Sequence, residues 1–251
     1  MTLRTALLLL FTGLLFGCVS TGHVDPMKTD KGRDEARDAY IQLGIGYLNQ
    51  GNTEQAKVPL KKALELDPGN ADANGALAIL FQNEMEPELA DEHFRKAISS
   101  RPDSRFLNNY GAFLYEQGRY AEAKERYLQA VKDNMYPERS RVFQNLGLVS
   151  LKLNDRAEAK QYFERSIRLN KRQARPQLEL AKMAYEDKEY VPARKYYDAF
   201  SKLTEQNAES LLLGARLAKI FDDRDKAATL GLQLKRLYPG TPEYKQYMSE
   251  Q

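Results

Sequence analysis

The sequence predicts an all-α protein, a right-handed superhelical solenoid built from about six copies of one helix–turn–helix unit. Six alanines recur at intervals of 34, 33, 36, 34 and 34 residues: Ala56, Ala90, Ala123, Ala159, Ala193 and Ala227. Twelve positions before each stands another small residue: Gly44, Ala78, Gly111, Gly147, Ala181 and Ala215. A small pair that keeps its spacing indicates one close helix–helix contact, repeated in every copy. A plain helical bundle is the alternative, but a bundle does not need this fixed phase.

The first copy shows how each unit is expected to fold. Apolar residues at helical spacing predict its first helix: Tyr40, Leu43, Gly44 and Tyr47. After a break at residues 50–52, a second stripe predicts the second helix: Ala56, Leu60 and Ala63. Residues 67–70 (Asp-Pro-Gly-Asn) close the unit as a turn. Pro59 lies inside the second helix, where it removes one backbone hydrogen bond and is expected to kink the helix.

This unit resembles the tetratricopeptide repeat, a helix–turn–helix motif of 34 residues. The resemblance covers residues 37–240, with repeats near 37–70, 71–103, 104–139, 140–173, 174–207 and 208–240, and a C-terminal cap or tail at 241–251. Copy five departs from the pattern with Gln177 at a bulky position and Phe200 at a small one. In copy six, Gly231 replaces an aromatic residue, which puts the packing of that copy in question.

The first seventeen residues read as a lipoprotein signal peptide. Arg4 precedes an apolar run over residues 6–16, which is shorter than the roughly 20 residues that span a membrane. Residues 15–18 (Leu-Phe-Gly-Cys) resemble a bacterial lipobox, although Phe16 departs from the usual residue type. Cys18 is the only cysteine, so the resemblance implies that it carries acyl chains. Val19-Ser20 follow it, which by analogy with lipoprotein sorting favours the outer membrane.

Residues 18–36 are expected to form a lipidated, flexible tether, because residues 19–36 mix Ser, Thr, Gly, Pro, Asp and Lys without an apolar period. Removing residues 1–17 lowers the formal charge from +3 to +2, since Arg4 is their one charged residue. That balance does not indicate a nucleic-acid partner. The basic clusters at residues 139–141 and 171–175 are interpreted as solvated faces.

Chemistry for catalysis is missing from the sequence. The two histidines, His23 and His93, lack metal-ligand spacing, and His93 is expected on the surface. The glycines are explained by helix packing and turns, so no phosphate-binding loop is expected. We therefore expect no catalytic or metal site, no small-molecule substrate, and no cofactor apart from the covalent lipid on Cys18.

A partner is expected to bind the groove that first helices line in tetratricopeptide arrays. The candidate residues are Ile41, Ile45, Leu48, Ile79, Asn108, Asn109, Ala112, Tyr115, Asn145 and Leu148. The four apolar residues of the first two copies have no expected internal role, although the tether could cover them. Burying four such side chains yields roughly 6–12 kcal/mol, against an association cost of about 4–15 kcal/mol. The asparagine amides would therefore have to contribute hydrogen bonds.

Three stretches give a closer resemblance: residues 108–115, 136–147 and 190–194. They resemble the PilF/PilW family of type IV pilus biogenesis lipoproteins, and the match runs over essentially the whole chain. The resemblance implies a pilotin of a Gram-negative bacterium, anchored by lipid to the periplasmic face of the outer membrane. Such proteins bind the type IV pilus secretin and promote its localisation and multimerisation. A tetratricopeptide lipoprotein of another envelope machine, such as barrel-protein assembly, is the main alternative, and a peptidoglycan enzyme is a weaker one.

Overall fold

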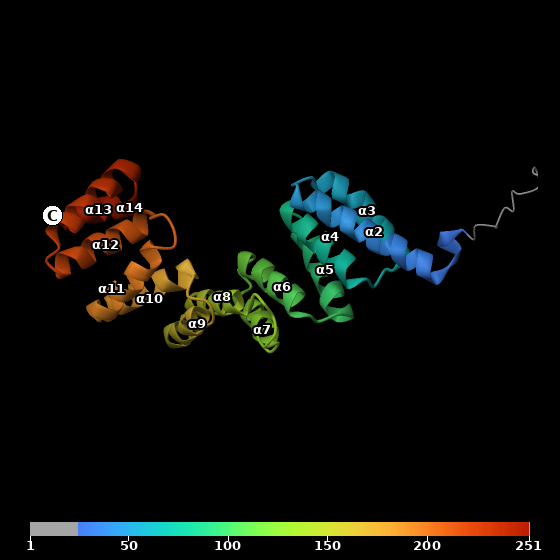
Figure 1. Cartoon of the computed structure of the whole chain (residues 1–251), viewed down its shortest axis with the longest axis horizontal. Coiled ribbons are helices and arrows are strands. Elements are labelled where there is room, and N and C mark those ends of the chain that lie inside the picture. The colour runs from blue at the N-terminus through green and yellow to red at the C-terminus, as the bar shows by residue number, and fades with distance from the viewer. Residues whose placement is uncertain (1–24, 251) are drawn as a thin grey trace, which may run out of the picture. The chain divides into compact units, whose positions relative to one another are not determined.

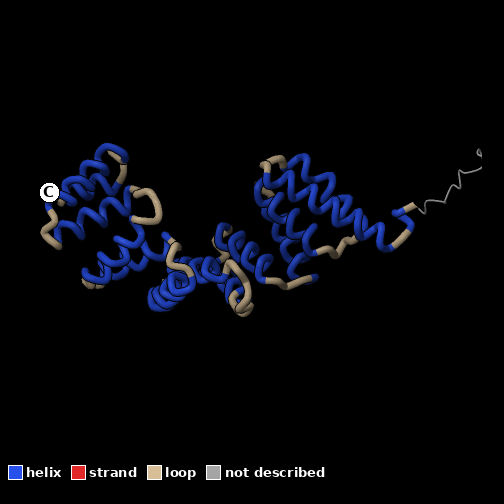
Figure 2. The backbone as a smooth tube through the Cα atoms, viewed as in Figure 1, coloured by secondary structure: helices blue, strands red, loops and turns tan. Residues whose placement is uncertain are grey.

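The computed structural model describes residues 25–250, and these residues contain thirteen α-helices, one short 3₁₀ helix and no strand (Figures 1 and 2). The all-α fold class is thereby confirmed for the described part of the chain. The signal peptide, Cys18 and the first part of the tether lie outside it. Close contacts divide the chain into two units, Met1–Ser100 and Arg101–Gln251, which are described separately.

Unit 1 contains a short 3₁₀ helix followed along the chain by two helix pairs. In chain order its elements are η1 (Pro26–Lys28), α2 (Asp30–Asn49), α3 (Thr53–Leu66), α4 (Ala71–Asn83) and α5 (Pro87–Ser100). Within each pair we call the earlier helix the first helix and the later one the second. α3 continues through the buried Pro59, so the proline does not end the helix.

Unit 2 contains four further pairs and a terminal helix. Its elements are α6 (Ser104–Glu116), α7 (Tyr120–Ala130), α8 (Arg139–Lys152), α9 (Arg156–Leu169), α10 (Ala174–Glu186), α11 (Tyr190–Ser201), α12 (Ala208–Ile220), α13 (Arg224–Leu237) and α14 (Pro242–Ser249). The expectation of about six repeats is confirmed by six helix pairs across residues 30–237.

The small residue of the first helix lets the second helix approach closely. A Cβ built on Gly111 would lie 2.7 Å from Cε1 of Tyr127, sixteen residues later in the chain. A Cβ on Gly44 would likewise lie 2.5 Å from Cγ of Leu60. Real Cβ atoms do not approach heavy atoms this closely, so only glycine fits at these two positions without rearrangement.

The turn between the two helices of a pair uses a left-handed residue at one fixed position. Six residues have positive φ: Gly51, Met85, Gly118, Asn154, Lys188 and Asp222. They recur at the repeat interval, one per helix pair. Glycine adopts this conformation without steric penalty, whereas the other four residues keep a Cβ in a disfavoured region.

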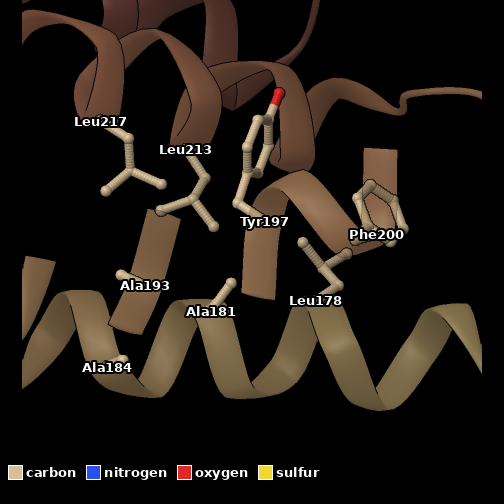
Figure 3. Close-up of a cluster of buried hydrophobic side chains, with 8 residues drawn as sticks. All are labelled: Leu178, Ala181, Ala184, Ala193, Tyr197, Phe200, Leu213 and Leu217. Atoms are coloured by element: carbon tan, nitrogen blue, oxygen red, sulfur yellow. The ribbon is translucent and has the colours of Figure 1, made fainter. Parts of the chain in front are cut away.

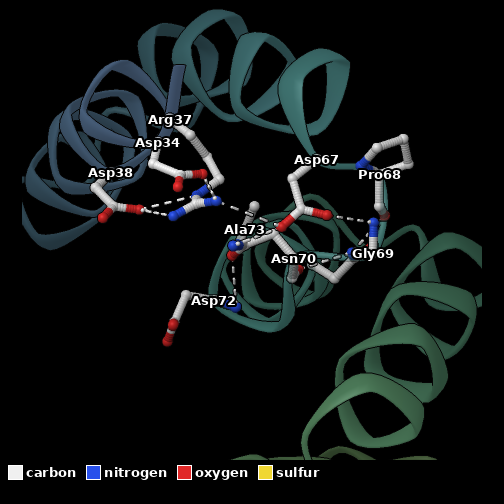
Figure 4. Close-up of polar contacts among 10 residues, drawn as sticks. Asp34, Arg37, Asp38, Asp67, Pro68, Gly69, Asn70, Asp72 and Ala73 are labelled. Atoms are coloured by element: carbon white, nitrogen blue, oxygen red, sulfur yellow. Dashed lines mark hydrogen bonds and ion pairs between the residues drawn. The ribbon is translucent and has the colours of Figure 1, made fainter. Parts of the chain in front are cut away.

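The expectation of a flexible tether through residue 36 is wrong for its last seven residues, which belong to α2. Thr29 caps this helix, because its Oγ1 accepts a hydrogen bond from the Gly32 N–H at 3.0 Å. Further along α2, Arg37 pairs with Asp34 at 2.6 Å and with Asp38 at 2.8 Å (Figure 4). The Asp34–Arg37 pair has the i, i+3 spacing that stabilises a helix, which favours an α2 that begins well before the first apolar stripe.

The apolar stripe expected on α2 is only partly buried. Leu43 is 49% exposed, whereas its equivalent in the second repeat, Leu77, is 2% exposed. Leu77 packs in one cluster with Ala56 and Leu60 of the preceding second helix. No preceding helix pair exists for Leu43 among the described residues, so the same sequence position remains open to solvent.

The unusual residues of copies five and six fit tightly. Phe200 is buried in a cluster with Leu178 and Tyr197 (Figure 3). A Cβ on Gly231 would collide with the phenol ring of Tyr247, which comes from α14. The space left by the missing aromatic side chain is therefore filled by the terminal helix, and this explains how the sixth copy packs.

Candidate partner-binding surfaces

In unit 1, the four expected groove residues do not share one environment. Ile41 is 7% exposed and packs against Ala63 and Ala73, because α4 covers that side of α2. The expectation that Ile41 has no internal role is wrong. Ile45 and Leu48 are half-buried against the core of this unit, so they too have a packing role, and Ile79 is also half-buried.

We call Ile45, Leu48 and Ile79 the apolar row. Its members are the expected groove residues of unit 1 that keep some solvent exposure. Ile45 and Ile79 each follow the small residue of their first helix, so they occupy the same place in neighbouring repeats. The row can contact an apolar side chain of a partner, but it offers less free surface than four fully exposed residues would.

In unit 2, two of the expected amide groups bond to each other. The Asn145 Nδ2 donates to the Asn108 Oδ1 at 3.2 Å, which joins α6 to α8. Asn108 is buried, so the expectation that it is available at the surface is wrong. Its side-chain oxygen accepts the hydrogen bond from Asn145 of the neighbouring repeat. Asn109 and the second N–H of Asn145 remain the amides that a partner could reach, since both residues are half-buried.

The other expected groove residues of unit 2 are also half-buried: Ala112, Tyr115 and Leu148. Tyr115 packs edge-on against Tyr120, with ring centroids 5.3 Å apart. Leu148 packs against the buried cluster around Phe163. These residues combine structural packing with partial exposure, so a partner could contact part of each side chain.

A charged network on α10 and α12 was not foreseen from the sequence. Glu179 is buried and pairs with Arg175 at 2.6 Å and with Lys182 at 3.2 Å, and Lys182 also reaches Glu209 at 2.5 Å. Burial lowers the pKa of Lys182, but Glu209 and Glu179 together raise it above its ordinary value. The signal in the sequence was the i, i+4 spacing of Arg175 and Glu179 with Lys182 three residues later.

His93 does not lie on the surface as expected. It is half-buried, its Nδ1 is 2.9 Å from Oδ1 of the buried Asn74, and its ring stacks on Phe81. Burial is the main cause that lowers the pKa of His93, with the charge of Lys96 acting in the same direction. The contact joins α4 to α5 and is structural.

Among residues 25–250, no group of histidine, cysteine, aspartate or glutamate side chains could hold a metal ion. Within the same range, no helix is long and apolar enough to cross a membrane. Cys18 lies outside these residues, so its lipidation stays a prediction.

Models of the tetratricopeptide repeat family match residues 38–70, 103–172 and 145–208. Together with the six helix pairs, these matches define a tetratricopeptide-repeat protein, a class whose first helices commonly present partner-binding surfaces.

The relatives specify the family within this class. The type IV pilus assembly protein PilF of Pseudomonas aeruginosa is 63% identical over 251 residues, the full length of both chains. A solved structure of Pseudomonas aeruginosa PilF has a TM-score of 0.85 at 64% identity, covering 88% of this chain and 100% of that one. PilW, described as a widely conserved type IV pilus biogenesis factor, has a TM-score of 0.71 at 27% identity, covering 85% of this chain and 99% of that one. The chain belongs to the PilF family and is a tetratricopeptide protein of type IV pilus biogenesis.

Proposed function

We propose that this chain is a lipid-anchored pilotin, a non-enzymatic adaptor that binds the type IV pilus secretin and promotes its assembly in the outer membrane. The observation that carries the proposal is identity of 63% over the full length with a type IV pilus assembly protein. The match covers the full length of both chains. Acylated Cys18 supplies the membrane address, and the repeats supply the protein contact.

The apolar row is the proposed contact for the secretin. Ile79 is its best probe, because it is half-buried and lies outside the buried clusters that hold Ile45 and Leu48. Covering the remaining surface of one such side chain stabilises a complex by about 1–2 kcal/mol. A carboxylate placed there would instead have to be desolvated on binding.

The contact is tested with Ile79→Asp in the full-length chain, followed by detection of heat-resistant secretin multimers in outer-membrane fractions. Val58→Asp is the matched control, because Val58 is 60% exposed on the second helix α3. Multimers should be lost in Ile79→Asp and retained in Val58→Asp, with equal helicity by circular dichroism. Normal multimers in Ile79→Asp would exclude the apolar row as the contact.

The anchor is tested with Cys18→Ser. Fractionation should show the secretin shifted away from the outer membrane, because the adaptor then lacks the acyl chains that hold it there. Retention of the wild-type distribution would refute the role of the lipid. The partner is identified by capture of envelope proteins on the purified chain. Recovery of secretin subunits supports the proposal, and recovery of barrel-assembly subunits in their place contradicts it.

A further inference from the structure

Three neighbouring repeats of unit 2 carry an arginine at the same place, in the first turn or two of the first helix. Arg105, Arg141 and Arg175 each lie six positions before the small residue of their repeat. Two more cations, Lys171 and Arg172, occupy the turn that leads into α10. We call these five residues the arginine edge. All five are exposed.

Hydrogen bonds hold the parts of the arginine edge next to one another. The Gln173 side chain donates to the Ser140 Oγ at 3.0 Å, which ties the turn containing Lys171 and Arg172 to the start of α8. The Asn145–Asn108 bond joins α8 to α6 a few residues beyond Arg141 and Arg105. The two basic clusters that the sequence analysis interpreted as separate solvated faces therefore form one edge within unit 2.

This arrangement is unfavourable for the helices themselves. The N-terminal end of a helix carries a partial positive charge and is stabilised by acidic side chains. The first turns of α2, α4 and α12 contain such residues. Those of α6, α8 and α10 contain none, although the N-cap residues Asp103 and Glu138 precede α6 and α8. The first helices of three successive repeats place cations near their N-terminal ends. This indicates a role outside helix stability, since such local conflicts concentrate at functional sites.

Internal partners neutralise only part of the edge. Arg141 pairs with Glu138 at 3.1 Å, and Arg175 pairs with the buried Glu179. The guanidinium of Arg105 lies 4.5 Å from the ring centroid of Phe106. Lys171 and Arg172 form no ion pair within residues 25–250. These two residues therefore keep positive charge of the edge facing solvent.

We propose that the arginine edge binds an extended, acidic segment of a partner protein. First helices in contact lie about 8–10 Å apart. An extended polyproline II segment advances about 3.1 Å per residue and presents the same face at every third residue. An acidic residue at every third position would therefore meet one arginine in each successive repeat. The half-buried amides of Asn109 and Asn145 lie on the same helices and can bond a peptide backbone, which favours a polypeptide over lipid headgroups. The surface is separate from the apolar row, so the inference does not depend on the proposed secretin contact.

The test uses the full-length chain in detergent and a fluorescent polyproline II peptide of about twelve residues with glutamate at every third position. Binding is measured by fluorescence anisotropy at about 50 and 200 mM salt. The triple variant Arg141→Gln, Lys171→Gln, Arg172→Gln should bind about tenfold more weakly and show less salt dependence. Arg175 is left in place because it pairs with the buried Glu179.

The control is the triple variant Lys195→Gln, Arg224→Gln, Lys235→Gln, which removes the same charge from exposed positions of second helices. Its affinity should stay within about twofold of the wild type. Equal weakening of both variants would overturn the proposal, because net charge alone would then explain binding. Equal affinity for a peptide with contiguous glutamates would also overturn it. So would binding of phosphatidylglycerol vesicles in the absence of peptide binding.

Discussion

Replacing Lys188 by glycine should stabilise the protein, although glycine normally weakens structure. Lys188 has φ of 61° in the turn between α10 and α11, and its N–H donates to the Tyr185 carbonyl at 3.0 Å. The left-handed conformation costs a residue with a Cβ about 1–2 kcal/mol. Glycine removes that cost but loses about 0.4–1 kcal/mol through greater freedom in the unfolded chain. The equivalent residue of the third repeat, Gly118, already adopts φ of 73°.

The net expectation for Lys188→Gly is a gain of about 0.5–1 kcal/mol in the free energy of unfolding. In a chain of this size that corresponds to about 1–4 °C in Tm, measured by circular dichroism. The control is Lys195→Gly, which changes the same residue type at an exposed position inside α11 and should lose about 1 kcal/mol. If both variants destabilise equally, the argument from the left-handed turn is wrong.

Two further predictions concern helix contacts. Gly111→Val should destabilise unit 2 by at least about 1–3 kcal/mol in denaturant unfolding, because its side chain meets the Tyr127 ring. Gly46→Ala, with nothing within 4 Å of the new Cβ, should instead be neutral or stabilising, and equal losses would contradict the close-approach argument. Because the folded pKa of His93 lies below its ordinary value, its contribution to stability is complete above about pH 6.5 and falls as pH drops toward the folded pKa. His93→Gln should reduce the dependence of Tm on pH between about pH 7.5 and 5. If the slope of Tm against pH is unchanged, the pH dependence comes from other groups.

The repeat phase could be predicted from the sequence because it depends on contacts that recur at one interval. Gly111 and Ala123 show this: their spacing fixes which faces of two successive helices meet, whatever the rest of the chain does. The turns between the two helices of a pair were equally visible, since Gly51 and Gly118 stand where a left-handed residue is needed. Asn154 and Asp222 are residue types that tolerate this conformation, whereas Met85 and Lys188 gave no such signal, because the fold imposes the conformation on them.

The candidate surfaces were predicted less well, and particular residues show why. Ile41 and Leu43 are both apolar and two positions apart, yet the first is buried and the second is exposed. Periodicity places them on different sides of α2 but cannot say which side a neighbour covers. Asn108 has the composition of a binding residue, but its oxygen is used by Asn145, whose position depends on how α8 packs on α6. His93 was misplaced for the same reason, since its partner Asn74 comes from another helix.

The sequence by itself determined the helix pairs, their number and their small-residue contacts, because these follow from spacing along the chain. The tertiary structure alone decided which apolar residues remain exposed, how α14 fills the space at Gly231, and that two distant basic clusters form one edge. The physical reason is that burial and charge depend on what packs across from a residue. That neighbour belongs to another helix, and often to another repeat, at a distance in sequence that local patterns do not encode.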